Sequence, residues 1–295
     1  MDESSASRSG KGPPLTLAEW MTVPAAKWVD ADAAFRWNRT GIEVARSRWK
    51  GRMPWRLSSV TEDRLFEELA LGCCNWNGRT RQAAVKELAR RTHGMELPFL
   101  LLRLNDWAWQ VRTQAANALK DRLHAGYAGH WVRWVPLADR VTQGLREDHA
   151  WLMPELQALL GSPQCLDELW DGLKSEVRFT RMWCLNVALE RGGAVAQAAC
   201  ELAMHDREPS IRFQALRRRM MAATPAEVQI WHAKWGRDSF MPIRRLLLQA
   251  LQPLDEAAWG KGCAQRFSTA MPRCVRWRAI TSKRKSMRQR PTARP

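Results

Sequence analysis

The sequence predicts an all-α fold made of many short helices, and three observations lead to this prediction. Apolar residues recur with the i, i+3, i+4, i+7 spacing of an amphipathic helix almost everywhere between residues 60 and 280. The pairs Asn77-Gly78 and Asp171-Gly172, which could mark hairpins between strands, lie between helical patterns instead. One pattern of residues also returns several times along the chain, as it does in an α-solenoid of stacked helix pairs.

The repeated pattern is an Arg followed by an Ala three residues later and a Leu seven residues later, with an Asn or Asp six residues before the Arg. Two copies, offset by 31 residues, are Asn75, Arg81, Ala84 and Leu88, then Asp106, Arg112, Ala115 and Leu119. Two further copies contain Asp206 with Arg212 and Asp238 with Arg244.

Three weaker copies of the pattern complete the series. Their anchor residues and the residues six positions earlier are Pro154 with Asp148, Arg178 with Gly172, and Arg276 with Ala270.

Where a copy of the pattern has an Asp or Asn at the turn, that residue is expected to cap the helix that follows it. The residue before the Arg, the Ala and the Leu share one helical face. Since one helix pair cannot bury that face alone, the sequence predicts about six to seven stacked pairs.

This pattern resembles the HEAT repeat, in particular the bacterial PBS-lyase-like subgroup, in which Asp and Arg are separated by five residues ahead of an Ala and a Leu. The resemblance covers residues 60–280 and implies a ladder of hydrogen bonds between successive repeats. The implied ladder residues are Asn75, Arg81, Asp106, Arg112, Arg178, Asp206, Arg212, Asp238 and Arg244. The ladder is expected to be interrupted at Pro154, Gly172 and Ala270.

The segments around the repeats have distinct compositions. We expect residues 1–14 to be a disordered leader and residues 15–57, which contain five Trp, to be a helical N-terminal cap. The repeat array is expected to span residues 58–280, with its last repeat incomplete. Residues 281–295 carry six basic residues and no acid. This tail is either a polybasic arm or the scar of a truncated or frame-shifted reading frame.

The sequence contains no motif of a common enzyme or cofactor site. It has no glycine fingerprint for dinucleotides, no P-loop, no zinc-protease motif and no nucleophile elbow. The six His have no ligand spacing, so we expect no metal and no cofactor. The seven Cys form no Cys-x-x-Cys motif, which favours a reduced, cytoplasmic protein. We find neither a signal peptide nor a membrane-spanning run.

A candidate binding surface follows from the same frame. Residues one and five positions after each anchor Arg point away from the packing face, and in HEAT-like arrays that side lines the concave groove. The resulting candidate partner-binding residues are Lys86, Asn117, Phe179, Trp183, Phe213, Arg217, Arg245 and Gln249. Phe, Trp and Arg in the second half of this row are typical of binding hot spots.

The net charge of +17 and the 17 Trp leave two classes of function open. We expect a non-enzymatic scaffold that binds a protein partner through its concave face. The alternative is a nucleic-acid-binding protein, including a relative of the HEAT-like alkylpurine DNA glycosylases, although the candidate row lacks a convincing carboxylate. Arginines that form the ladder favour protein binding, whereas arginines that line one groove favour nucleic acid.

The incomplete last repeat predicts self-association through the C-terminal end. A helix that begins near Pro272 and ends near Ile280 would leave Trp259, Phe267 and Trp277 poorly covered, and such an apolar patch favours association. Light scattering across a concentration series should therefore show a growing mass. A monodisperse monomer at high concentration would contradict this prediction.

Overall fold

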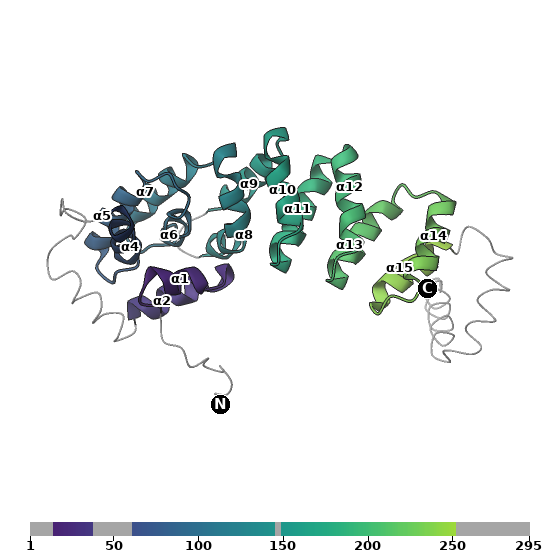
Figure 1. The fold of residues 1–295 in the computed structure, drawn as a ribbon, viewed down its shortest axis with the longest axis horizontal. Helices are drawn as coiled ribbons and strands as arrows, with labels where there is room; N and C mark the ends of the chain where they lie inside the picture. The colour runs from purple at the N-terminus through teal and green to yellow at the C-terminus, as the bar shows by residue number, and fades with distance from the viewer. Residues whose placement is uncertain (1–13, 38–60, 145–148, 252–295) are drawn as a thin grey trace, which may run out of the picture. The chain divides into compact units, whose positions relative to one another are not determined.

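The structure, a computed structural model, describes residues 14–37, 61–144 and 149–251 (Figure 1). Within these ranges the chain forms fourteen α-helices and three short 3-10 helices and contains no strand, which confirms the all-α prediction. The leader up to residue 13, the second half of the expected cap, the incomplete last repeat and the basic tail lie outside the described residues. In the described part of the chain, no helix combines the length and the apolar character needed to cross a membrane.

The chain divides into two compact units, Met1–Ala199 and Cys200–Pro295. The sequence instead predicts one continuous array, and a single solenoid that runs through both units stays a prediction. Each unit is therefore described by itself, with helix α12 (Gly193–Ala203) containing the boundary between them.

The first unit begins with three short helices and continues with four helix pairs. Its N-terminal helices are α1 (Leu17–Thr22), η1 (Ala25–Lys27) and α2 (Trp28–Trp37). The first two pairs are α4 (Glu62–Cys73) with α5 (Gly78–Leu88), and α6 (Leu97–Arg103) with α7 (Trp109–Lys120). The next two are α8 (Ala128–Thr142) with α9 (Leu152–Leu160), and α10 (Leu166–Leu173) with α11 (Arg178–Arg191), with the 3-10 turns η3 (Ala125–Tyr127) and η4 (Pro163–Cys165) before them.

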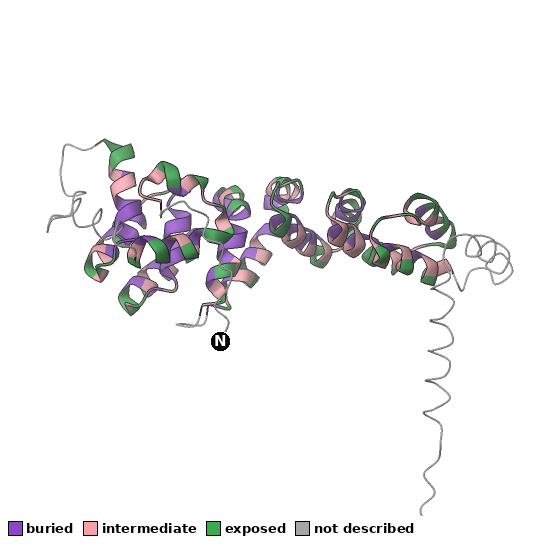
Figure 2. Ribbon diagram, turned by 90° about the horizontal axis from the view of Figure 1, so that it is seen from below, coloured by how far each residue is buried: buried purple, intermediate pink, exposed green. Residues whose placement is uncertain are grey.

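The pairs of the first unit pack side by side. The first helices α4, α6, α8 and α10 contact one another in that order, and the second helices α5 and α7 contact each other. The buried face of each helix points into this stack, as the purple stripes in Figure 2 show. Helix α5 carries Ala84 and Leu88 on that face, as the repeat frame predicts, and Val85 is buried beside them. The interval between the anchor residues Arg112 and Pro154 is longer than the other intervals, and it contains α8, the first helix of the third pair.

The N-terminal segment packs across the side of the stack. Helices α1 and α2 with the turn between them contact α4, α6 and α8, so the segment is more than a cover for the first pair (Figure 1). The Trp28 ring lies 5.1 Å from Phe99 of α6 and 4.8 Å from Trp134 of α8, measured between ring centroids. All seven residues of α6 are buried. A helix that is apolar on all sides must be covered by neighbouring elements on all sides, and α2 covers one side of α6.

Helix α2 also carries an acid into the core. Arg103 of α6 is fully buried, and its Nη2 lies 2.5 Å from Asp32 Oδ2 of α2. Its Nη1 lies 3.3 Å from Asp106 Oδ2. Burying a guanidinium without an acid beside it would cost free energy of folding, so Asp32 stabilises the packing of α6 as well as that of α2.

The second unit is smaller in its described part, residues 200–251. It contains the end of α12, then α13 (Pro209–Met220), α14 (Pro225–Trp235) and α15 (Met241–Leu251). Helix α15 contacts both α13 and α14. The core between them is formed by Ile211, Ala215, Leu216, Val228, Trp231, Ile243 and Leu247. Thr224 caps the N-terminus of α14 and forms a reciprocal capping box with Glu227.

Asp32→Asn should destabilise the first unit by about 3 kcal/mol, because it leaves Arg103 buried with one acid fewer. The matched control is Asp30→Asn on the same helix, whose side chain is exposed and lies 3.9 Å from Arg140 at the surface. That control should change the free energy of unfolding by less than about 0.5 kcal/mol. Urea unfolding measures both, and equal midpoints for the two variants would contradict the role of Asp32.

Candidate functional site

Arg81 connects two successive turns of the first unit. Its Nη1 donates to the carbonyl oxygens of Asn75 and Trp76, at 3.0 and 2.9 Å, in the turn before its own helix. Its Nε and Nη2 donate to Asp106 Oδ2 and Oδ1, at 2.7 and 2.8 Å, in the turn of the next pair. The guanidinium therefore uses four of its five donor hydrogens to hold the two turns together.

The second unit repeats this arrangement. Arg212 donates to the carbonyl of Asp206 at 3.0 Å, and its Nε and Nη2 reach Asp238 Oδ2 and Oδ1 at 3.1 and 2.9 Å. Arg112 and Arg244 bond the carbonyls of their own turns in the same way, at 2.8 Å to Asp106 and 2.6 Å to Asp238. With the exception of Arg178, the residues predicted for the ladder thus lie at the helix turns.

The turn residues act differently from the predicted helix caps. Asp106 Oδ1 accepts from the backbone N–H of Ala108 at 3.0 Å, and Asp238 Oδ1 accepts from Phe240 at 2.8 Å. These bonds span two residues and end before the first helical turn, so the Asp side chains form Asx turns rather than helix N-caps. The expectation of an N-cap is wrong for them, because the helices begin three residues later, at Trp109 and Met241.

The fourth pair has a different anchor from the predicted Arg178. Arg181 Nη1 donates to the carbonyls of Ser175 and Glu176 at 2.9 and 3.1 Å, and Ser175 Oγ accepts from Val177 N at 3.2 Å. Ser175 therefore takes the turn position, and Arg178 lies exposed at the start of α11. Gly172 has another role, since a Cβ there would lie 2.3 Å from Cys184 Sγ. The sequence pattern missed this register because a serine replaces the usual Asp or Asn.

The corrected register also changes the candidate binding row in this pair. The positions one and five after Arg181 are Met182 and Asn186, so Phe179 and Trp183 are not equivalent to the other predicted residues. Phe179 is 39% exposed at the start of α11, and Trp183 is half-buried against the core.

The other row residues face outward on the second helices. Lys86 of α5 and Asn117 of α7 are exposed in the first unit. Arg217 of α13 and Arg245 and Gln249 of α15 are exposed in the second unit, and Phe213 is half-buried there. The Phe213 ring lies 6.2 Å from that of Phe240 in an edge-to-face contact. Binding by these residues stays a prediction.

A buried polar cluster that no sequence motif predicts lies between the first helix pairs. Arg122 Nε and the Tyr127 hydroxyl both donate to Glu96 Oε1, at 2.8 and 2.7 Å. Arg122 also donates to the carbonyls of Ala118 and Arg91. Burial and the bond to Glu96 raise the pKa of Tyr127 to about 12. The cluster joins the loop between α5 and α6 to the loop between α7 and α8. The only feature of the sequence that could have drawn attention to it is that Tyr127 is the single Tyr of the chain.

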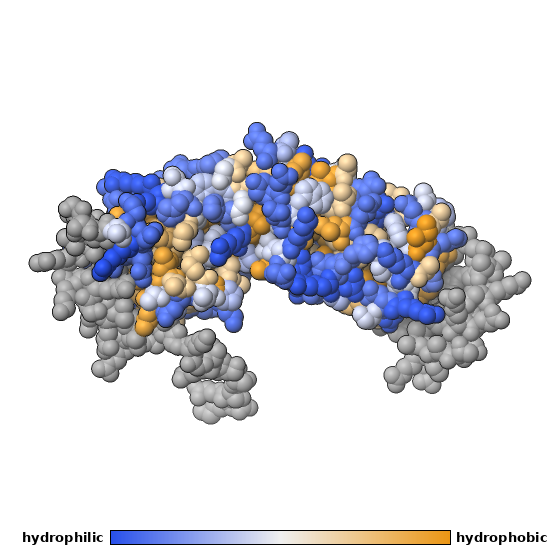
Figure 3. All heavy atoms as spheres, viewed as in Figure 1, coloured by the Kyte–Doolittle hydropathy of each residue, from blue (hydrophilic) through white to orange (hydrophobic). Residues whose placement is uncertain are grey.

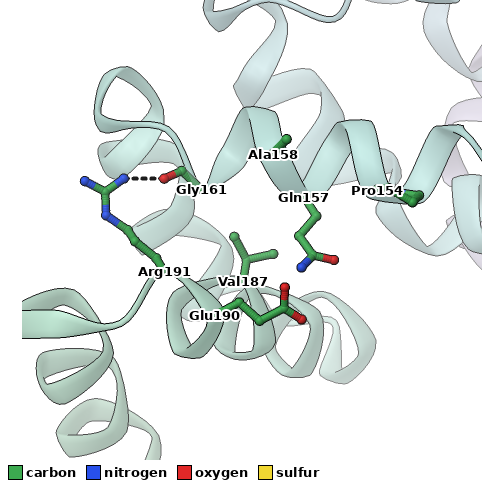
Figure 4. Close-up of a pocket in the computed structure, with 7 residues that line it drawn as sticks. All are labelled: Pro154, Gln157, Ala158, Gly161, Val187, Glu190 and Arg191. Carbon is green, nitrogen blue, oxygen red and sulfur yellow. Dashed lines mark hydrogen bonds between the residues drawn. The ribbon is translucent and has the colours of Figure 1, made fainter.

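An open cleft of 330 Å³ lies between the second helices α9 and α11 (Figure 4). Pro154, Ala158 and Val187 form its apolar part, and Gln157 and Glu190 point toward each other across it. Arg191 donates to the carbonyl of Gly161 at one end. The cleft is therefore a shallow recess beside the outward face of the second helices.

The described cysteines are buried within the helices. Burial raises the pKa of the Cys73 and Cys184 thiols to about 12, so both are protonated at neutral pH and are poor nucleophiles. Among the residues that the structure describes, no three His, Cys, Asp or Glu side chains are grouped so that they could hold a metal ion.

Comparisons with protein-family models, with curated proteins and with solved structures found no match. The HEAT resemblance therefore continues to depend on the sequence pattern.

The ladder predicts a pH dependence of stability. Burial alone would raise the pKa of Asp106, but the bonds from Arg81 and the charge of Arg103 outweigh it and lower the pKa to about 2. Because this pKa lies below that of an unfolded Asp, Asp106 should contribute about 2 kcal/mol above pH 4, and this contribution should be lost as the pH falls toward 2.

Unfolding free energies of the wild type and Asp106→Asn, measured from pH 5 to pH 2, test this prediction. The difference between the two proteins should shrink as the pH falls. A difference that stays constant over that range would show that Asp106 carries no such linkage.

Proposed function

We propose that this chain is a non-enzymatic scaffold that binds a protein partner through the outward face of its second helices. One observation carries the proposal. On α5, α7, α13 and α15 the residue five positions after the anchor Arg is exposed, whereas the Arg itself is bonded to the turns. Most arginines of the repeat pattern therefore serve architecture, and the surface beside them has a mixed polar and aromatic composition.

The ladder supports binding by making this surface rigid. The second helices α5, α7, α11, α13 and α15 each start from a turn whose carbonyl oxygens are held by a guanidinium of that helix. A surface fixed before a partner arrives loses less conformational entropy on binding. The cleft between α9 and α11 adds a recess in the first unit that can accept a side chain of the partner.

Nucleic acid is the second candidate, and the exposed arginines of α13 and α15 favour it. In the described chain Arg81 and Arg212 are not available to phosphates, because they are paired with Asp106 and Asp238. In the first unit the row contains Lys86 and Asn117, so its positive charge does not continue from repeat to repeat. A strand of phosphates needs such continuity along its path.

Site-specific photo-crosslinking, carried out in the cells that naturally produce the protein, tests the proposal. A benzophenone side chain replaces Asn117 or Gln249 on second helices, and Asp171 or Gln229 on first helices as matched exposed controls. The row positions should give a protein adduct of defined mass that survives nuclease treatment, and the controls should give none. Adducts of equal yield at all four positions, or adducts that nuclease removes, would refute protein binding by the row.

A further inference from the structure

The second unit presents a positively charged patch on two neighbouring helices. We define the arginine patch as Arg217 and Arg218 of α13 and Arg245 of α15, all exposed. The two helices contact each other directly. Neighbouring helices lie about 8–10 Å apart, so side chains on their outward faces can reach one ligand. In the view of Figure 3, the surface over α13 and α15 is largely hydrophilic.

No acid of the described chain neutralises this patch. Helices α13 and α15 contain no Asp or Glu. Residues 200–251 contain nine basic residues and five acidic ones, and two of the acids, Asp238 and Glu227, already pair with Arg212 and Arg219. Within the described residues, the guanidinium groups of the arginine patch form no ion pair, and Arg218 Nη1 donates to the sulfur of Met221 at 3.7 Å.

An apolar contact borders the same patch. Phe213 precedes Arg217 by one helical turn, so the two side chains share the outward face of α13. Phe213 is half-buried and packs edge-to-face against Phe240, in the turn before α15. Exposed Arg beside partly exposed aromatic rings is a composition common at protein interfaces.

We propose that the arginine patch binds an acidic segment of the partner protein, with one apolar side chain of that segment placed against Phe213 and Phe240. This inference rests on the proposed function and names the chemistry of the partner in the second unit. Carboxylates suit the planar donor groups of arginine. The ring pair favours a polypeptide over a sugar-phosphate strand, because both rings are half-buried and packed against each other, whereas a base stacks on an exposed ring face.

Fluorescence anisotropy with the full chain tests this inference. The probe is a short labelled peptide in which Glu and Asp flank one Phe, and the control peptide has Gln and Asn in place of the acids. A single-stranded oligothymidylate of equal charge is the nucleic-acid probe. The acidic peptide should bind more tightly than both, and its affinity should fall as salt is added.

Arg217→Glu with Arg245→Glu should weaken binding of the acidic peptide by at least about tenfold, because two attractive contacts become repulsive. The matched control is Arg64→Glu with Arg79→Glu, which changes the net charge equally on exposed residues of the first unit. Both control sites lie in first helical turns, where an acid is favourable, so folding should be retained. Circular dichroism checks the fold of both variants.

Three outcomes overturn the inference. The first is equal weakening by both double variants, which would mean a response to net charge alone. The second is tighter, patch-dependent binding of oligothymidylate, which would assign the patch to nucleic acid. The third is no preference for the acidic peptide over its neutral control. If crosslinking at Gln249 still yields a protein adduct in that third case, the proposed function stands and only the acidic partner is refuted.

Discussion

The guanidinium bridge at the helix turns is the interaction on which the rest of the structure depends. Arg81 and Arg212 each satisfy two carbonyl groups of their own turn and both oxygens of the next Asp. Turn carbonyls inside a helical stack would otherwise lack partners, and an unpaired buried carbonyl is costly. The bridge also fixes the offset of α5 against α7 and of α13 against α15, and with it the positions of the outward side chains on these second helices.

A second constraint acts in the first unit, where α6 is apolar on all sides except for Arg103. Its burial requires both apolar cover and an acid, and α2 supplies the two together through Trp28 and Asp32. The N-terminal helices are therefore an integral part of the core. The second unit has no such extra layer in its described residues, where Arg217, Arg218 and Arg245 remain exposed.

These two constraints divide the positive charge of the chain into two groups. Arginines at the anchor positions are structural, because their donors are directed at turns and buried acids. Arginines such as Arg217 and Arg245 lie one position or more beyond the anchors and have no acid beside them in the described chain. Net charge alone does not distinguish the two groups, since it counts paired and unpaired arginines equally.

The sequence by itself determined the all-α class, the position of most helix pairs and most of the ladder arginines, because the spacing of residues along the chain defines the repeated helical face. It placed the fourth anchor at Arg178 instead of Arg181, since Ser175 forms the turn without an Asp or Asn. Only the tertiary structure decided that α2 covers α6, that Glu96 holds Arg122 and Tyr127, and which arginines lack acids. Those contacts join residues from different helix pairs, and local periodicity carries no information about which distant side chains meet.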